Sequence, residues 1–147
     1  MKKYSVINRQ SGFTLLEVMV VLVIIGIIAS MVVPNLMGSQ DTAREQKAVI
    51  DIGSLETALG MYRSQNYNYP TTEQGLEALV EQTEIEPLPK RFPEGGFIKR
   101  LPKDPWGNDY QLLNPGEHGK MDVFSMGPDG EANTDDDIGN WNLGDYQ

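Results

Sequence analysis

The sequence predicts an α+β fold in which one long N-terminal helix packs on a small domain containing a short antiparallel sheet. Three observations predict it. A continuous apolar run occupies residues 13–33, a pattern of helical period follows it to about residue 65, and the C-terminal part carries short apolar stretches between turn residues. At 147 residues, the chain has room for one small soluble domain besides the apolar run.

The apolar run is long enough to cross a membrane. As a helix its 21 residues would measure roughly 31 Å, which matches the hydrocarbon core of a bilayer. Only three of them are clearly polar: Thr14, Glu17 and Ser30. We therefore expect residues 13–34 to form a transmembrane and assembly helix. The leader, residues 1–12, holds three basic residues and no acid, which favours a cytoplasmic N-terminus.

A processing site is predicted before the apolar run and not after it. A secretory signal has its small-residue cleavage site after the apolar stretch, and Ala29 and Ser30 match that pattern weakly. A cut between Gly12 and Phe13 would remove the basic leader and make the apolar helix the mature N-terminus. The alternative is an uncleaved signal anchor with an incidental acid.

Glu17 is a carboxylate with no basic partner inside the run. Such a charge costs roughly 2.5–3.5 kcal/mol near the centre of a membrane helix, less near an end, and it usually has a partner. Cleavage before Phe13 creates an ammonium group four residues away. Identical helices shifted by about one turn would bring Glu17 of one copy to the Phe13 amine of the next. We therefore predict that Glu17 sets the register of a polymer.

Residues 40–65 predict an amphipathic helix with a single apolar stripe. The stripe consists of Ala48, Ile52, Leu55, Leu59 and Tyr62. We expect it to seat the small domain, and fewer than three clean heptads make a coiled coil the weaker alternative. Pro34, just past the apolar run, predicts a bend or a local loss of helix near residues 29–34.

A second helix is expected after residue 70, with Thr71 or Thr72 as its cap and Gln74 as a capping-box partner. Its buried face would be formed by Leu76, Leu79 and Val80. Two short strands are expected around Tyr110–Leu113 and Lys120–Ser125, and the turn NPGEHG between them predicts a hairpin.

The charge of the chain limits the classes of function. Its net charge is −9, and seven acids without any Lys or Arg occupy residues 121–147, which argues against binding nucleic acid. The absence of cysteine excludes disulfides and thiol chemistry, and makes a bound metal a plausible stabiliser. The single histidine, His118, lies in a glycine-flanked turn and is expected to be an exposed loop residue, so zinc and enzyme sites have little support.

The segment 124–141 is rich in the hard oxygen ligands that calcium prefers. An EF-hand does not fit, because Thr134 stands where that motif needs glycine and Asn140 where it needs glutamate. Phe124 and Trp141 flank the loop and are expected to hold both of its ends against the core. On the residues alone, a solvated acidic loop is at least as good an interpretation as a calcium site.

The stretch GFTLLEVMVVLVIIGIIASMVVP resembles the class III signal of type IV pilins and pseudopilins. The resemblance implies that a prepilin peptidase cuts after Gly12 and methylates the new N-terminal Phe13, and that Glu17 is the assembly glutamate. Three further stretches, YPTTEQGLEALV, LPKDPWGNDYQL and DIGNWN, are similar to the major pseudopilins of the type II secretion system. The fold implied is pilin-like, with residues 35–147 as a periplasmic globular domain that includes the amphipathic half of the long helix.

The resemblance implies a structural subunit and not an enzyme. Copies would polymerise into a periplasmic pseudopilus that drives export of folded proteins across the outer membrane, from a single-pass protein of the inner membrane. The implied partners are the prepilin peptidase, minor pseudopilins, an inner-membrane platform with its cytoplasmic ATPase, and indirectly the outer-membrane secretin. It also implies a structural Ca²⁺ in the acidic loop, with a ligand set of the Met126 backbone oxygen, Asp129, Asn133, Asp136 and Asp137.

Two alternatives stay open from the sequence. One is a type IV pilin used in adhesion, motility or DNA uptake, although many such pilins close a C-terminal loop with a disulfide that this chain cannot form. The other is a membrane-anchored periplasmic enzyme or binding protein, which would have a pocket and no need of Glu17.

Overall fold

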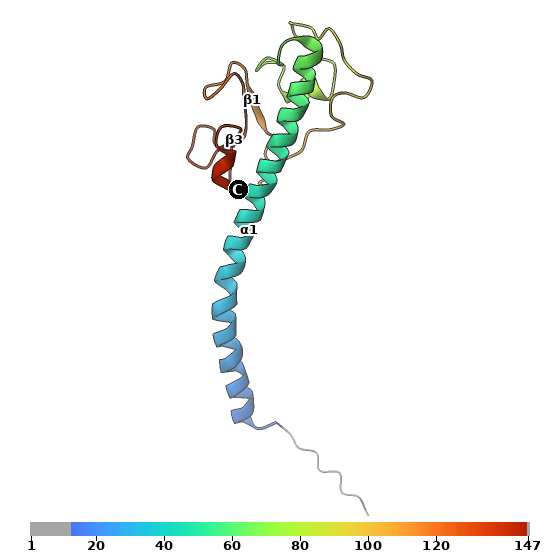
Figure 1. Ribbon diagram of the computed structural model, residues 1–147. Coiled ribbons are helices and arrows are strands. Elements are labelled where there is room, and N and C mark those ends of the chain that lie inside the picture. The colour runs from blue at the N-terminus through green and yellow to red at the C-terminus, as the bar shows by residue number, and fades with distance from the viewer. Residues whose placement is uncertain (1–12, 147) are drawn as a thin grey trace, which may run out of the picture. The chain divides into compact units, whose positions relative to one another are not determined.

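The computed structural model describes residues 13–146, without the side chains of residues 31–39. In chain order the elements are α1 (Leu15–Asn66), the 3-10 helix η1 (Leu76–Leu79), β1 (Gln111–Leu113), β2 (Asp122–Ser125), β3 (Ile138–Gly139) and the 3-10 helix η2 (Leu143–Tyr146) (Figure 1). The chain divides into two compact units, one ending at Ser39 and the other beginning at Gln40. Each unit is described by itself.

Helix α1 begins with a side-chain cap. The hydroxyl of Thr14 accepts the backbone N–H of Glu17 at 3.2 Å, and the Thr14 carbonyl accepts the N–H of Val18 at 3.2 Å. Thr-x-x-Glu is the capping-box pattern, so Glu17 occupies the third position of the helix. A carboxylate there also interacts favourably with the helix dipole.

Helix α1 runs through Pro34 without interruption, so the local loss of helix expected near residues 29–34 does not occur. Proline removes a single backbone donor and strains one turn, and a long helix can absorb that loss when the turns on both sides hold.

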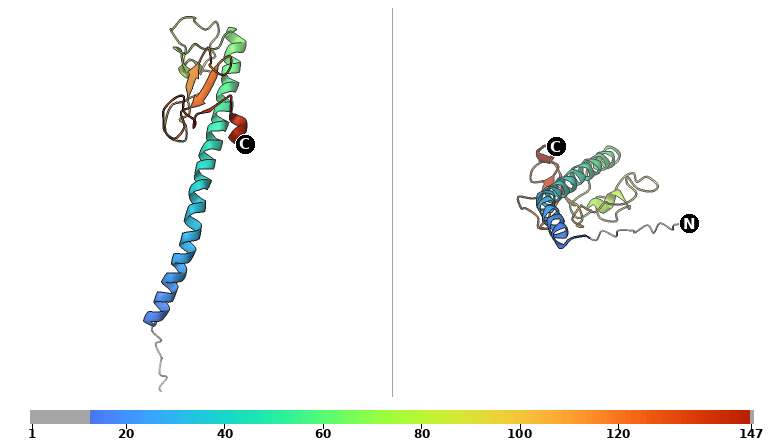
Figure 2. Two further views of the ribbon diagram at one scale, coloured as in Figure 1. Left: turned by 90° about the vertical axis from the view of Figure 1, so that its left-hand side faces the viewer. Right: turned by 90° about the horizontal axis from the view of Figure 1, so that it is seen from below.

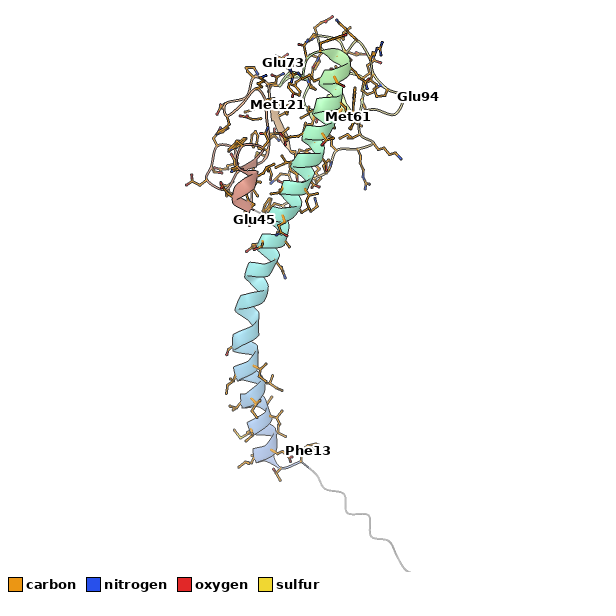
Figure 3. All side chains as sticks on the ribbon, viewed as in Figure 1. Phe13, Glu45, Met61, Glu73, Glu94 and Met121 are labelled. Carbon is orange, nitrogen blue, oxygen red and sulfur yellow. The ribbon has the colours of Figure 1, made fainter. Side chains whose placement is uncertain are left out.

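The apolar segment of α1 presents its side chains to the surroundings. Every residue from Phe13 to Ser30 is exposed, and Phe13 itself is 85% exposed (Figure 3). Among the described residues, no helix combines the length and the apolar character that crossing a membrane requires.

The core of the second unit forms around the predicted stripe of α1. All five stripe residues are buried, each with no more than 2% of its surface exposed, and they pack with Leu79, Leu112 and Val123. Figure 2 shows the strands lying along the C-terminal half of the helix. Burial of each large aliphatic side chain contributes about 1.5–3 kcal/mol, so this stripe is the main attachment of the sheet to α1.

The sheet is antiparallel in the order β1-β2-β3, with Leu112 opposite Val123 and Phe124 opposite Gly139. The predicted hairpin is confirmed, since β1 and β2 fall within the two expected ranges. All four residues of the central strand β2 are buried. Strand β3 was not predicted, because two residues are too short to show an alternating pattern.

The predicted second helix is only a short 3-10 turn, η1. Its capping box is present, since the Gln74 N–H donates to the Thr71 hydroxyl at 3.2 Å and the Thr71 N–H donates to Gln74 Oε1 at 3.0 Å. Gly75 follows with φ +62° and ψ −170°, which no α-helix accepts. The capping box therefore closes a turn, and Leu76 and Leu79 are buried without an α-helix between them.

The side-chain amide of Gln74 organises the connection that follows. It is 4% exposed, and its Nε2 donates to the carbonyls of Ile85 at 2.7 Å and Pro87 at 2.9 Å. These bonds hold a proline-rich segment that has no regular secondary structure.

Candidate functional sites

The predicted N-terminal site consists of Gly12, Phe13 and Glu17, of which Gly12 lies outside the described residues. Within the part of the chain that the structure describes, no side chain pairs with the Glu17 carboxylate. By contrast, another polar side chain of this segment, Ser30, has a hydrogen-bond partner, because its hydroxyl donates to the carbonyl of Ile27 on the same helix at 2.7 Å.

The acidic loop folds closely on itself at Gly127. This glycine has φ +62°, and a Cβ added there would clash with the Asp136 carbonyl oxygen and lie 2.7 Å from Asp136 Oδ2. Only glycine lets the two arms of the loop approach this closely.

The structure brings Asp129 and Asp136 together. The Asp129 N–H donates to Asp136 Oδ2 at 3.2 Å, and the Thr134 hydroxyl donates to Asp136 Oδ1 at 2.7 Å. The Thr134 bond is the main reason that the pKa of Asp136 lies below its usual range. Next to them, the Met126 carbonyl accepts the N–H of Gly130 at 3.2 Å.

Asp137 occupies a different environment. It is 6% exposed, its Oδ2 accepts the backbone N–H of Asn133 at 2.7 Å, and its Oδ1 is buried with no hydrogen-bond partner. Burial raises the pKa of Asp137, and the neighbouring charges of Asp136 and Asp129 raise it further, against the opposing bonds to backbone N–H groups of Asn133 and Thr134. A buried carboxylate oxygen without a donor is costly unless a cation meets it.

The oxygen atoms of the predicted ligands therefore suit a hard cation, although they do not all converge on one point. The described residues contain no group of three or more acidic, histidine or cysteine side chains arranged as a metal site. Of the predicted ligands, Asp129 and Asp136 lie together, whereas Asp137 is turned toward Asn133. An open hollow of about 260 Å³ lies beside Asp137, lined also by Asn133 and Trp141.

The turn before β2 is built on the buried carboxylate of Asp122. Its Oδ2 accepts the N–H groups of Glu117 at 2.7 Å and His118 at 2.8 Å, and its Oδ1 accepts that of Gly119 at 3.0 Å. Burial by itself would raise the pKa of Asp122, but these backbone bonds, together with the His118 side chain 3.1 Å away, lower it.

His118 is 45% exposed, in keeping with the expected loop position, but it is not free. Its ring stacks on Trp141 with the centroids 3.9 Å apart and the planes 11° apart. Trp141 also contacts Phe124, at 5.7 Å between ring centroids. Phe124 is buried as expected, but Trp141 is only partly buried and packs on Phe124 and His118 and not on the core cluster.

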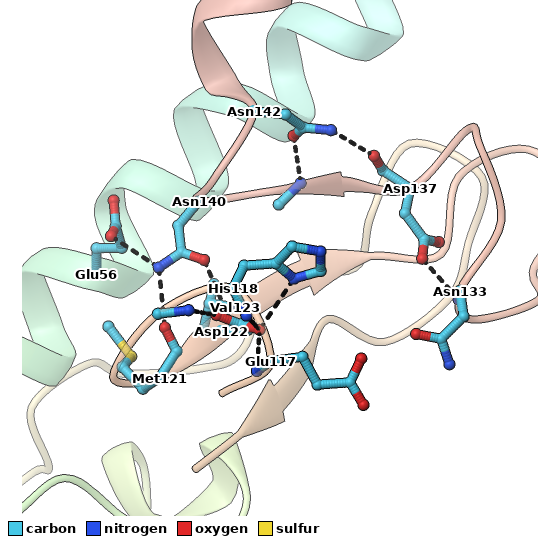
Figure 4. A network of polar contacts seen from close by, with 12 residues as sticks. Glu56, Glu117, His118, Met121, Asp122, Val123, Asn133, Asp137, Asn140 and Asn142 are labelled. Atoms are coloured by element: carbon cyan, nitrogen blue, oxygen red, sulfur yellow. Dashed lines mark hydrogen bonds and ion pairs between the residues drawn. The ribbon is translucent and has the colours of Figure 1, made fainter. Parts of the chain in front are cut away.

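Sequence reasoning missed Asp122 and Asn140. Asp122 is one acid among seven in an acidic segment, and it differs from the others in accepting three backbone N–H groups. Asn140 was noted only as a mismatch to an EF-hand, yet it bridges three parts of the domain (Figure 4). A signal for Asp122 was present, because an aspartate three residues after a glycine-flanked turn can accept several backbone N–H groups.

Both the N-terminal segment and the rest of the chain match known protein families. Residues 7–33 match the prokaryotic N-terminal methylation motif, and residues 35–141 match the family described as type II secretion system protein G. A core protein G from Aeromonas hydrophila is 67% identical over 140 residues, covering 95% of this chain and 98% of the relative. The protein of the same name from Escherichia coli K12 is 62% identical over 136 residues, covering 92% and 94%.

A solved structure is similar as well. The major pseudopilin of the type 2 secretion system of enterohaemorrhagic Escherichia coli matches with a TM-score of 0.69 and 58% identity, covering 75% of this chain and 96% of that chain. A long N-terminal helix, a small antiparallel sheet and a methylation motif define the class of the pilin-like structural subunits. Within that class, the chain belongs to the type II secretion system protein G family.

Proposed function

We propose that this chain is the structural subunit that polymerises into the pseudopilus of a type II secretion system and so helps to drive folded proteins across the outer membrane. The observation that carries the proposal is the adjacency of two matches in one chain, the methylation motif over residues 7–33 and the protein G family over residues 35–141. A generic type IV pilin would share the first match only. Polymerisation, and not catalysis, is the activity proposed.

The N-terminal chemistry follows from the motif. The prepilin peptidase cuts between Gly12 and Phe13 and methylates the Phe13 amine, and the Glu17 carboxylate of each subunit pairs with the amine of a neighbour. Before assembly, residues 13–34 anchor the subunit in the inner membrane, with a cytoplasmic N-terminus and a periplasmic domain. The remaining partners are the minor pseudopilins, the inner-membrane platform with its cytoplasmic ATPase and, indirectly, the outer-membrane secretin.

The N-terminus of the membrane-extracted protein tests this chemistry. We expect Edman sequencing and intact mass to give Phe13 as the first residue, carrying one methyl group. A Gly12→Leu variant should retain the leader and fail to form fibres. A wild-type protein that begins at Met1 and still forms fibres would contradict the proposed chemistry.

We also propose that the acidic loop binds a structural Ca²⁺. The unpartnered buried Oδ1 of Asp137 and the tight approach at Gly127 support it. The ligands would be the carboxylates of Asp129, Asp136 and Asp137, the Met126 carbonyl and Asn133. The ion would supply a positive charge among carboxylates whose repulsion otherwise opposes folding of the loop.

Calcium removal provides the second test. We expect the full-length protein in detergent to melt several degrees lower in EGTA than in excess calcium, because the ion binds only the folded loop. An Asp137→Asn variant should lose most of this difference, while Asp135→Asn, an exposed neighbour outside the ligand set, should keep it. Equal melting temperatures of the wild type in EGTA and calcium would count against the site.

A further inference from the structure

Asn140 is bonded on all sides at the boundary between the sheet and α1. Its Nδ2 donates to Glu56 Oε1 on α1 and to the carbonyl of Met121, each at 3.2 Å. Its Oδ1 accepts the N–H of Val123 at 3.2 Å, and its own N–H donates to the Val123 carbonyl at 3.0 Å. Figure 4 shows this side chain between the helix and β2. Both ends of the amide are therefore used.

The side chain of Asn142 holds the segment that leads from the acidic loop to Asn140. Asn142 accepts the N–H of Gly139 with its Oδ1 at 2.9 Å and donates from its Nδ2 to the carbonyl of Asp137 at 2.9 Å. Gly139 also pairs with Phe124 in the sheet. Asp137 and Asn140 are thus the two ends of a four-residue segment whose two middle residues pair with β2 (Figure 4).

Residues 137–140 link the acidic loop to α1 through a side-chain hydrogen bond. Among the described residues, the bond from Asn140 to Glu56 is the one side-chain hydrogen bond that joins residues 124–146 to α1. Ile138 lies in the buried apolar cluster that includes the α1 stripe, and Tyr146 packs against that cluster. Apolar contacts tolerate small shifts, whereas a hydrogen bond requires distance and direction.

We infer that Asn140 is a positioning residue that couples order in the acidic loop to helix α1 at Glu56. The inference rests on the proposed cation binding. When Asp137 is held by the cation, β3 and Asn140 are held in register, and Glu56 is fixed on the surface of α1. When the loop loosens, the Asn140 amide loses its alignment, and the α1 turns around Glu56 open more often.

Hydrogen–deuterium exchange on the full-length protein in detergent micelles tests the coupling, in calcium and in EGTA. In the wild type, calcium should slow exchange in the loop, residues 126–137, and also in α1 around Glu56, the latter by roughly fivefold, as expected for one hydrogen bond. In Asn140→Ala the loop should still respond to calcium, while α1 should no longer respond. The matched control is Asn114→Ala, which removes a bond to the Pro70 carbonyl and should leave both responses intact.

A pair of variants at Glu56 separates coupling from a general structural role. Glu56→Gln keeps an acceptor oxygen and should preserve the response of α1, whereas Glu56→Ala should abolish it. This pair also carries the test if Asn140→Ala does not fold. The inference is overturned if α1 in Asn140→Ala or Glu56→Ala still responds to calcium, or if only the loop responds in the wild type. A wild type in which neither region responds removes the cation proposal and the coupling with it.

Discussion

Replacing Glu17 with alanine is expected to abolish fibre formation while the unit that begins at Gln40 stays folded. The carboxylate has no side-chain partner among the described residues, and Thr14 caps the helix through the backbone N–H of residue 17, which alanine retains. The substitution therefore removes the charge and leaves the helix start intact. Without that charge, the N-terminal amine of the neighbouring subunit has no anion to meet in an apolar environment.

The measurement is the amount of fibre sheared from cells that carry the complete secretion system, together with the amount of monomer in the membrane. Monomer should remain at the wild-type level. Ser30→Ala is the matched control, because the Ser30 hydroxyl is satisfied within its own helix and its loss should leave assembly unchanged. Fibres of normal length and number from Glu17→Ala would contradict the assembly role of this acid.

Replacing Asp122 with alanine is expected to destabilise the folded domain by about 3 kcal/mol. The carboxylate is almost fully buried and accepts three backbone N–H groups of residues 117–119. Alanine would leave these donors without an acceptor and remove the group that shapes the turn between β1 and β2. Thermal or urea unfolding in the presence of excess calcium measures the loss. Asp109→Ala is the control, since Asp109 is exposed in its ion pair with Lys103.

The same residue gives the stability a pH dependence of known sign. The pKa of Asp122 is lowered in the folded state, so folding favours the ionised form. Its contribution is complete above the ordinary pKa of 3.8 and is lost as the pH falls through the lower folded pKa. Below pH 4, wild-type stability should therefore fall more steeply than that of Asp122→Asn. Parallel curves for the two proteins would mean that Asp122 is not the group responsible.

The parts of the fold that could be predicted were those with a repeating pattern. The stripe from Ala48 to Tyr62 repeats at helical spacing, and each of its members is buried. The hairpin was predicted because two short apolar stretches flank a turn of glycine and proline. In both cases several residues report the same structure, so the pattern does not depend on any one of them.

The parts that could not be predicted depend on single residues. Gly75 turns a correctly predicted capping box into a 3-10 turn, because its backbone takes a conformation that propagates no helix. Pro34 predicted a bend or a local loss of helix, and the loss of helix does not occur. Strand β3 has two residues and is recruited by its neighbour β2, which no local pattern announces.

The candidate sites divide in the same way. The N-terminal motif is local in sequence, so Phe13 and Glu17 could be assigned functions from it. The acidic loop is local too, but its geometry was open, and the structure places Asp129 with Asp136 while it buries Asp137 beside Asn133. The role of Asn140 could not be predicted from local sequence, because Glu56, its partner on α1, lies 84 positions earlier in the chain.

Gln74 has a consequence for which residues of the bend at residues 81–88 can vary. The amide of Gln74 binds the carbonyls of Ile85 and Pro87, and within the bend Thr83 and Glu86 accept backbone N–H groups. The path of the bend therefore rests on these three side chains and not on the carboxylates of Glu81 and Glu84. Glu81 and Glu84 are exposed there and can be exchanged for other residues at little loss of stability. Related subunits can therefore present different charges on this bend while they share one interior.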